Sequence, residues 1–335
     1  MPLSQLVLLL LTASAPAPEP PPEPAEAAWA EWSDFPGQPL FTTTDPFEYE
    51  RSGLFAPPLL MPKGCFAFSL RFDYASAIQL YNNQPNSVLL DAEIGHLTFA
   101  GALKVSPTLF LFLMGGVQGA YAGFMDQFLN WYHGLFGIPY EARAERPLNK
   151  FGYYFQTATA RQSFKPVGLT LLDTTVGVGW MLAKNLQLLT VVVVPTASVD
   201  GYAAHTFQFG AMLTWQVPFL WSWLQFQGTL GFGGTPQAGG GLLQPYQNVV
   251  FGSFSTGLKA RLTERNFLYA NFFLQSPIYH HTGDPPLDVV DGSLDFGWMF
   301  HTDSDWELWA GITENPVANG IALDVVFTLG VRYGF

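Results

Sequence analysis

Charged residues are scarce in this chain, at 12% of the sequence, whereas soluble domains carry roughly 25%. The chain also lacks an apolar run of the roughly 20 residues that a membrane-spanning helix needs. The longest candidates, "TLFLFLMGGV" and "LQLLTVVVVP", reach about half that length. A closed β-barrel is the other structure that satisfies the backbone in lipid. These two deficits together favour a barrel that crosses a membrane through its strands.

Basic residues and cysteine are also in short supply. The 14 Lys and Arg against 26 Asp and Glu give a formal charge of -12. This balance argues against a nucleic-acid partner, because binding to phosphates needs an excess of Lys and Arg. The single cysteine, Cys65, excludes an internal disulfide framework and a metal site built from cysteines. We predict no metal site and no cofactor.

Aromatic residues are abundant, at 16%, and they alternate with polar ones. In "FAFSLRFDY", residues 66–74, the aromatic side chains point to one side of an extended chain, and Arg71 and Asp73 point to the other. The same period of two recurs along the chain. It predicts strands at about 65–75, 88–101, 108–116, 170–182, 186–197, 203–216, 222–233, 247–262, 266–275, 290–301, 305–313 and 321–335. The predicted fold is an all-β membrane protein, a single antiparallel up-and-down transmembrane β-barrel of about 12 strands.

The lengths of the connections alternate. Tight turns are predicted at 104–107, 183–185, 218–222, 263–266 and 302–305, and long loops at 76–87, 117–169, 234–245 and 276–289. Short periplasmic turns and long outer loops are typical of outer-membrane barrels. The pattern therefore predicts a location in the cell outer membrane, with its lipids and lipopolysaccharide as partners.

The last strand, "DVVFTLGVRYGF", ends in an aromatic pair at Tyr333 and Phe335. It resembles the terminal strand of outer-membrane barrels. That resemblance implies recognition of Phe335 by the barrel-assembly machinery.

Charged residues on the strands are expected to face the lumen, because a Lys or Arg on the lipid side near the midplane costs roughly 2–4 kcal/mol. They either neutralise one another inside a narrow barrel or form a selectivity ring or binding site, and the spacing leaves both possibilities open. The predicted lumen charges are Arg71, Asp73, Asp91, Glu93, Asp173, Lys259, Arg261, Asp295, Glu307, Asp324 and Arg332.

One segment, at about 123–136 in the longest loop, has a helical period. This amphipathic helix is expected either to cap or plug the outer mouth, or to lie flat at the interface with its aromatic residues in lipid. Asp126, Asn130 and His133 fall on adjacent turns and could form a polar site, and a solvated helix face is the alternative that explains the same residues. Arg143 and Arg146 suit phosphate groups such as those of lipopolysaccharide. Pairing with Glu141 and Glu145 in the same loop is the alternative.

The N-terminal residues have a different composition. Residues 1–15 combine a short apolar core with Ala13-Ser14-Ala15, which predicts a signal peptide and its cleavage site. Residues 16–40 begin with a Pro/Glu/Ala-rich stretch and are predicted to form a disordered tether. The barrel domain is then expected over 41–335.

The helical segment "FMDQFLNWYHGLFGIPYEARAERP" resembles the signature of an uncharacterised family of Gram-negative outer-membrane proteins, known only as a domain of unknown function. Weaker matches are "LLDAEI", "VVVVPTAS" and "WELWAGITENP", and the sequence departs from the family pattern at Ala92, Ala197 and Asn315. The resemblance implies an outer-membrane barrel and assigns no activity. The matching residues in the helical segment are Phe124, Met125, Asp126, Phe128, His133, Phe136, Gly137, Ile138, Pro139 and Arg143.

Three functions fit these features. The first is a gated channel or carrier for small or hydrophobic solutes, in which the loop helix closes the mouth. The second is a lipid-acting hydrolase at the barrel rim, with His133 oriented by Asp126, or with His280 or His281, as the general base. The third is a structural barrel that anchors a partner through the tether at residues 16–28.

Overall fold

The structure is a computed structural model, and it describes residues 62, 64–83, 86–136, 146–198, 206–218, 223–236, 242, 244–277, 279–283, 287–314 and 323–334. The predicted signal peptide, the tether, Arg143 and Phe335 lie outside these residues. None of the helices in the described part is long and apolar enough to cross a bilayer.

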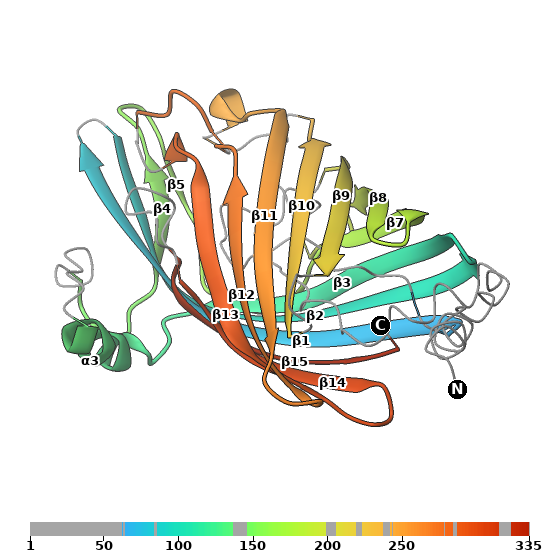
Figure 1. Cartoon of the computed structure of the whole chain (residues 1–335). Helices are drawn as coiled ribbons and strands as arrows, with labels where there is room; N and C mark the ends of the chain where they lie inside the picture. The colour runs from blue at the N-terminus through green and yellow to red at the C-terminus, as the bar shows by residue number, and fades with distance from the viewer. Residues whose placement is uncertain are drawn as a thin grey trace, which may run out of the picture.

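Within the described residues, twelve antiparallel strands form a closed barrel (Figure 1). The first and last strands close it, with Phe68 opposite Tyr333 and Tyr74 opposite Phe327. The predicted fold class is confirmed. The ring consists of β1 (Phe66–Asn83), β2 (Asn86–Ser106), β3 (Leu109–Tyr121), β7 (Thr174–Ala183), β8 (Leu186–Val194), β9 (Gln208–Pro218), β10 (Leu224–Gly234), β11 (Val250–Arg261), β12 (Asn266–Gln275), β13 (Asp291–His301), β14 (Trp306–Glu314) and β15 (Leu323–Tyr333).

The prediction of a long loop at 76–87 was wrong. β1 continues to Asn83 and β2 begins at Asn86, so the two strands form one long hairpin. Alternation fades in this hairpin because both faces are covered: Ala75 and Ala77 point inward, Ile78 points outward, and all three are buried. A strand that is apolar and buried on both faces carries no period-two signal.

The longest connection, between β3 and β7, contains secondary structure of its own. Short strands β4 (Gly152–Gln156) and β5 (Arg161–Ser163) extend the sheet beyond the end of β3, where β4 pairs with Ser87–Asp91 of β2. Strand β6 (Val167–Leu171) pairs with β3. These strands of three to five residues were not predicted, because they are too short to show a period.

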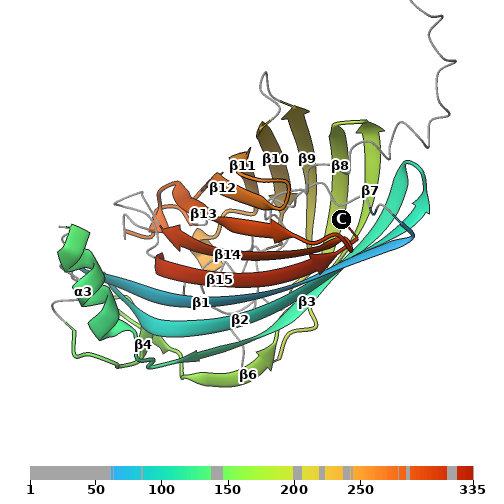
Figure 2. The same ribbon diagram turned by 60° about the horizontal axis from the view of Figure 1, so that its bottom comes forward.

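The same connection holds the predicted helix, α3 (Asp126–Phe136). It lies beside the barrel wall, away from the C-terminus (Figures 1 and 2). This end of the barrel, where the β3–β7, β10–β11 and β12–β13 connections lie, is called the long-loop end below. The opposite end, which includes the turns at Lys184-Asn185 and 302–305, is the short-turn end.

The outward side of the wall is apolar and exposed. Phe72 is 43% exposed and Leu329 is 60% exposed, and they lie opposite each other on β1 and β15. Outward residues of β13 such as Phe296 and Trp298 are similarly exposed. A contiguous apolar band of this kind marks an interaction with lipid or protein.

Candidate functional site

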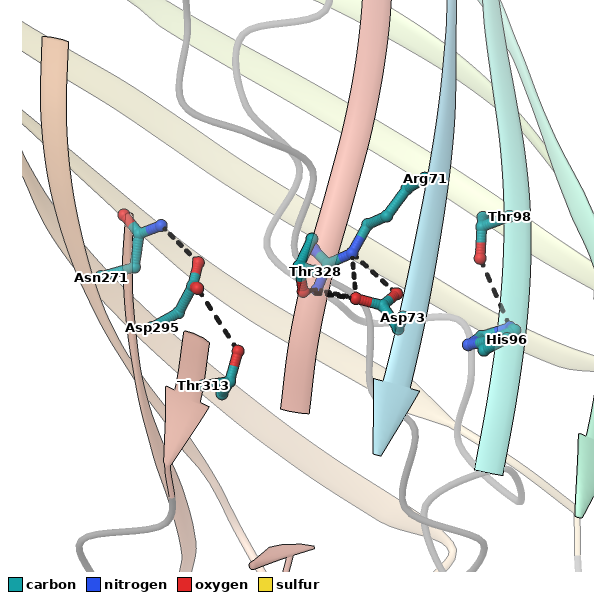
Figure 3. Close-up of polar contacts among 8 residues, drawn as sticks. All are labelled: Arg71, Asp73, His96, Thr98, Asn271, Asp295, Thr313 and Thr328. Atoms are coloured by element: carbon teal, nitrogen blue, oxygen red, sulfur yellow. Dashed lines mark hydrogen bonds and ion pairs between the residues drawn. The ribbon is translucent and has the colours of Figure 1, made fainter. Parts of the chain in front are cut away.

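The charged side chains of the inner wall, in the part of the chain that the structure describes, form three polar groups, and the first joins β1 to β15. Arg71 Nε donates to both carboxylate oxygens of Asp73 at 2.8 Å, and Arg71 Nη2 donates to Thr328 Oγ1 at 3.1 Å. The Thr328 hydroxyl donates to Asp73 Oδ1 at 2.5 Å. Figure 3 shows the three side chains meeting between their strands. Both charged residues are almost completely buried, so each neutralises the other in a site with little water.

The second group centres on Asp295 of β13. Asn271 Nδ2 donates to Asp295 Oδ2 at 3.2 Å, and Thr313 Oγ1 donates to Asp295 Oδ1 at 3.3 Å (Figure 3). The neighbouring Tyr269 ring lies across β13 and β14, where a Cβ at Gly311 would come within 2.2 Å of the tyrosine hydroxyl. Glycine at this position therefore makes room for the ring.

The third group lies near the short-turn end. Glu307 of β14 forms an ion pair with Arg332 of β15, and its other oxygen lies 3.5 Å from His301 Nδ1. Lys259 is fully buried on the same inner face. Arg261 follows on β11, with its guanidinium carbon 5.9 Å from the centroid of the Phe267 ring.

The structure thus places seven of the eleven predicted lumen charges on the inner face. Asp173 lies between β6 and β7, where its Oδ1 accepts the backbone N–H of Ala197 at 2.9 Å. Asp324 is in β15, and its side chain lies outside the described part of the structure. The inward-facing charges are Arg71, Asp73, Lys259, Arg261, Asp295, Glu307 and Arg332.

The lumen placement of Asp91 and Glu93 was wrong. Residues that lie directly opposite each other on paired strands share a face. Glu93 lies opposite Tyr121, which is 38% exposed, and Asp91 lies opposite Ile78 on the outward side of β1. Both acids therefore point away from the lumen.

This prediction failed because the apolar residues of β2 do not face the same side along the whole strand. Leu90 and Ile94 point inward, whereas Leu97 and Phe99 point outward, and the pairing with β1 runs through without a bulge. The polar side chains change sides with them. Equating the polar face with the lumen over the whole strand produced the error.

Inward-pointing apolar residues form a cluster near the long-loop end, which we call the mouth cluster. It combines buried residues of β1, β2, β3, β4 and β15 with Tyr279 and Leu287 from the β12–β13 connection. The sequence signal was the run of apolar residues at even positions 88–94, in antiphase to the rest of β2. The strand residues of the cluster are Ala75, Ala77, Val88, Leu90, Ala92, Ile94, Ala120, Tyr153, Phe155 and Val326.

Outward-facing acids bind the segment that contains α3. Glu93 accepts the Tyr74 hydroxyl and the backbone N–H of Met125, just before the helix begins. A carboxylate at this position also interacts favourably with the helix dipole. On β14, Glu314 Oε1 accepts the Tyr132 hydroxyl at 2.9 Å. These hydrogen bonds attach α3 to the outside of the barrel.

The three residues predicted to form a polar site on α3 do not share one environment. Asp126 and His133 are buried against the protein, whereas Asn130 is exposed. Asp126 accepts the backbone N–H of Asn149. Arg146 Nε forms an ion pair with Asp91 of β2 at 2.9 Å, and the alternative partners Glu141 and Glu145 lie outside the described residues. Because α3 packs on the outer wall, it does not plug the lumen in this structure.

The histidines considered as general bases lie in two places, His133 on α3 and His280 and His281 in the β12–β13 connection. Asp126 and His133 are seven residues apart on the helix, which separates them by about 10 Å along its axis. His280 and His281 lie next to each other in the loop, with their rings nearly perpendicular and the ring centroids 5.3 Å apart. In the part of the chain that the structure describes, no group of three His, Cys, Asp or Glu residues could hold a metal ion.

A family profile described as "Protein of unknown function (DUF3187)" matches residues 54–335. The chain belongs to the DUF3187 family. The resemblance of its helical motif to an uncharacterised family is thereby confirmed. No curated protein sequence matches this DUF3187 chain.

Solved structures resemble this family member in fold. An outer membrane channel from Pseudomonas putida F1 matches 82% of this chain and 97% of its own, at 10% sequence identity and a TM-score of 0.54. A FadL homologue of Pseudomonas aeruginosa matches 88% and 99%, at 12% identity and a TM-score of 0.43. The translocator domain of autotransporter NalP from Neisseria meningitidis matches 81% and 89%, at 11% identity and a TM-score of 0.43. The fold is that of outer-membrane barrels.

Proposed function

We propose that this protein is an outer-membrane channel or carrier for small hydrophobic solutes. The closed barrel, with its apolar outward band, supports a position in a membrane. The likeness in fold to an outer membrane channel from Pseudomonas putida F1 is compatible with transport. The observation that carries the choice of solute is the mouth cluster.

An inward-facing apolar cluster is unexpected in a barrel that conducts only water-soluble molecules, because such lumens are lined by polar residues. Here Leu90 and Ile94 are fully buried on the inner side, and the aromatic rings of Tyr153 and Phe155 lie next to them. Ligand pockets for apolar molecules are lined in this way, with a few polar groups nearby. The three polar groups of the inner wall supply the polar part of the path.

The gate differs from the one expected from the sequence. Since α3 lies on the outer wall, closure is assigned to the loop residues of the mouth cluster, such as Tyr279 and Leu287, and to the ion pairs behind them. Arg71 and Asp73 are 2% and 0% exposed.

The test compares two Ala→Phe substitutions in cells that express the barrel. Ala92 belongs to the mouth cluster, whereas Ala270 is exposed on the outward face of β12. We expect the wild type to speed uptake of the hydrophobic dye N-phenylnaphthylamine. Ala92→Phe should lower that uptake several-fold, and Ala270→Phe should leave it unchanged. Folding is checked by the shift in gel mobility between heated and unheated samples.

Uptake of a small sugar serves as the polar reference. If the wild type admits the dye no faster than cells without the protein, the proposal fails. It fails equally if Ala92→Phe and Ala270→Phe behave alike while both proteins are folded.

A further inference from the structure

Helix α3 presents three different faces, although a helix on the surface of a soluble protein has two. At 100° per residue, one arc contains Leu129 and His133, and it is buried against the barrel together with Met125, which directly precedes the helix. A second arc is apolar and exposed. It consists of Phe128, Trp131 and Leu135, which are 42%, 61% and 63% exposed, and Phe124, just before the helix, is 70% exposed.

The third arc is polar and also exposed. It contains Gln127 and Asn130, together with Gly134, where an added Cβ would meet open space. The exposed apolar arc is therefore bordered by a polar arc on one side and by the barrel contact on the other. Three faces match three media, namely the protein wall, hydrocarbon and water.

The apolar arc continues the outward band of the barrel. The Phe128 ring lies 6.0 Å from the ring of Phe327, an outward residue of β15. Phe128 also contacts Trp131 and Tyr132, at centroid distances of 5.7 and 6.2 Å. One apolar surface thus runs from the strands onto the helix. Whatever covers the band on β15 covers this arc as well.

The orientation of the helix is fixed by its contacts. Glu93 binds the backbone just before the first turn, and Glu314 binds Tyr132 in the middle of the helix. Met125 and Leu129 pack on Val325 of β15, between these two hydrogen bonds. A helix held at two points cannot rotate to bury its exposed aromatic residues against its own barrel.

We propose that α3 is a membrane-interface helix that inserts its apolar arc among the acyl chains of the leaflet around the long-loop end, with Gln127 and Asn130 turned toward water. The partner is the lipid itself. Tryptophan at a membrane–water boundary fits this role, because its ring combines an apolar body with a polar N–H group. The helix then lies at the level where the bilayer surface meets the outside of the barrel. This proposal does not depend on which solute passes through the lumen.

The experiment places a fluorescent probe on each exposed arc. Cys65→Ser removes the only native thiol. Trp131→Cys and Leu135→Cys then test the apolar arc, Gln127→Cys and Asn130→Cys test the polar arc, and Leu329→Cys on the barrel wall is the lipid-facing reference. All five are labelled with an environment-sensitive dye and reconstituted into phosphatidylcholine vesicles, with or without bromine on the acyl chains.

We expect brominated chains to quench the dye at positions 131, 135 and 329 at least threefold more than at 127 and 130. Equal, weak quenching on both arcs of a folded barrel would overturn the proposal. So would a dimer in light scattering whose interface protects position 131 without bromine quenching, because the arc would then bind a second copy. Quenching as expected without dye uptake by cells would separate this inference from the transport proposal.

Discussion

Replacing Arg71 with Met should destabilise the barrel far more than breaking an ion pair on its surface. Arg71 and Asp73 are joined through two nitrogens and two oxygens and are 2% and 0% exposed. Methionine fills a similar volume without the charge. The Asp73 carboxylate then retains the Thr328 hydroxyl as a donor, but it loses its positive partner in a site closed to water.

The expected size follows from this burial. Removing one member of a buried ion pair costs about 3–5 kcal/mol, whereas replacing both members with apolar residues is often neutral. We therefore expect Arg71→Met to lower the free energy of unfolding by about 3–5 kcal/mol. The double substitution Arg71→Met/Asp73→Leu should recover most of that loss.

The matched control is Arg265–Asp303, an ion pair near the short-turn end whose side chains are 53% and 78% exposed. Arg265→Met should cost at most about 1 kcal/mol, because exposed pairs contribute little. Equilibrium unfolding in guanidinium chloride, followed by tryptophan fluorescence in detergent micelles, measures all three variants. The reasoning is refuted if Arg71→Met costs no more than Arg265→Met, or if the double variant is less stable than the single one.

Two further predictions concern glycines. Gly297→Ala should destabilise the barrel by about 1–3 kcal/mol, because its Cβ would lie 2.2 Å from the carbonyl oxygen of Ala310. Gly252→Ala, whose nearest neighbour is 3.6 Å away, should be tolerated in the same unfolding assay, and equal losses would contradict this account. Gly123→Ala should loosen α3, because Gly123 has φ +70° and its Cβ would fall on the Glu93 carboxylate. Faster proteolysis near α3 is the expected result, with Gly134→Ala as the unaffected control.

The sequence by itself determined the barrel. One side of a strand such as Asp291–His301 faces outward and the other faces the lumen. Apolar and polar residues therefore alternate along the strand, and this alternation can be recognised in the sequence. The helix in the long loop was predicted for the same reason, because its period differs from that of the strands.

Only the tertiary structure decided which medium each face meets near the long-loop end. Glu93 is accommodated on the outward side because Met125, just before α3, donates its backbone N–H to the carboxylate, and no pattern within β2 reveals a contact with a residue 32 positions further along the chain. The mouth cluster depends likewise on Tyr279 and Leu287, which approach Leu90 only after the ring has closed. The period of two in the sequence shows that a strand has two different faces, whereas contacts between distant segments determine whether a face meets lipid, the lumen or another part of the protein.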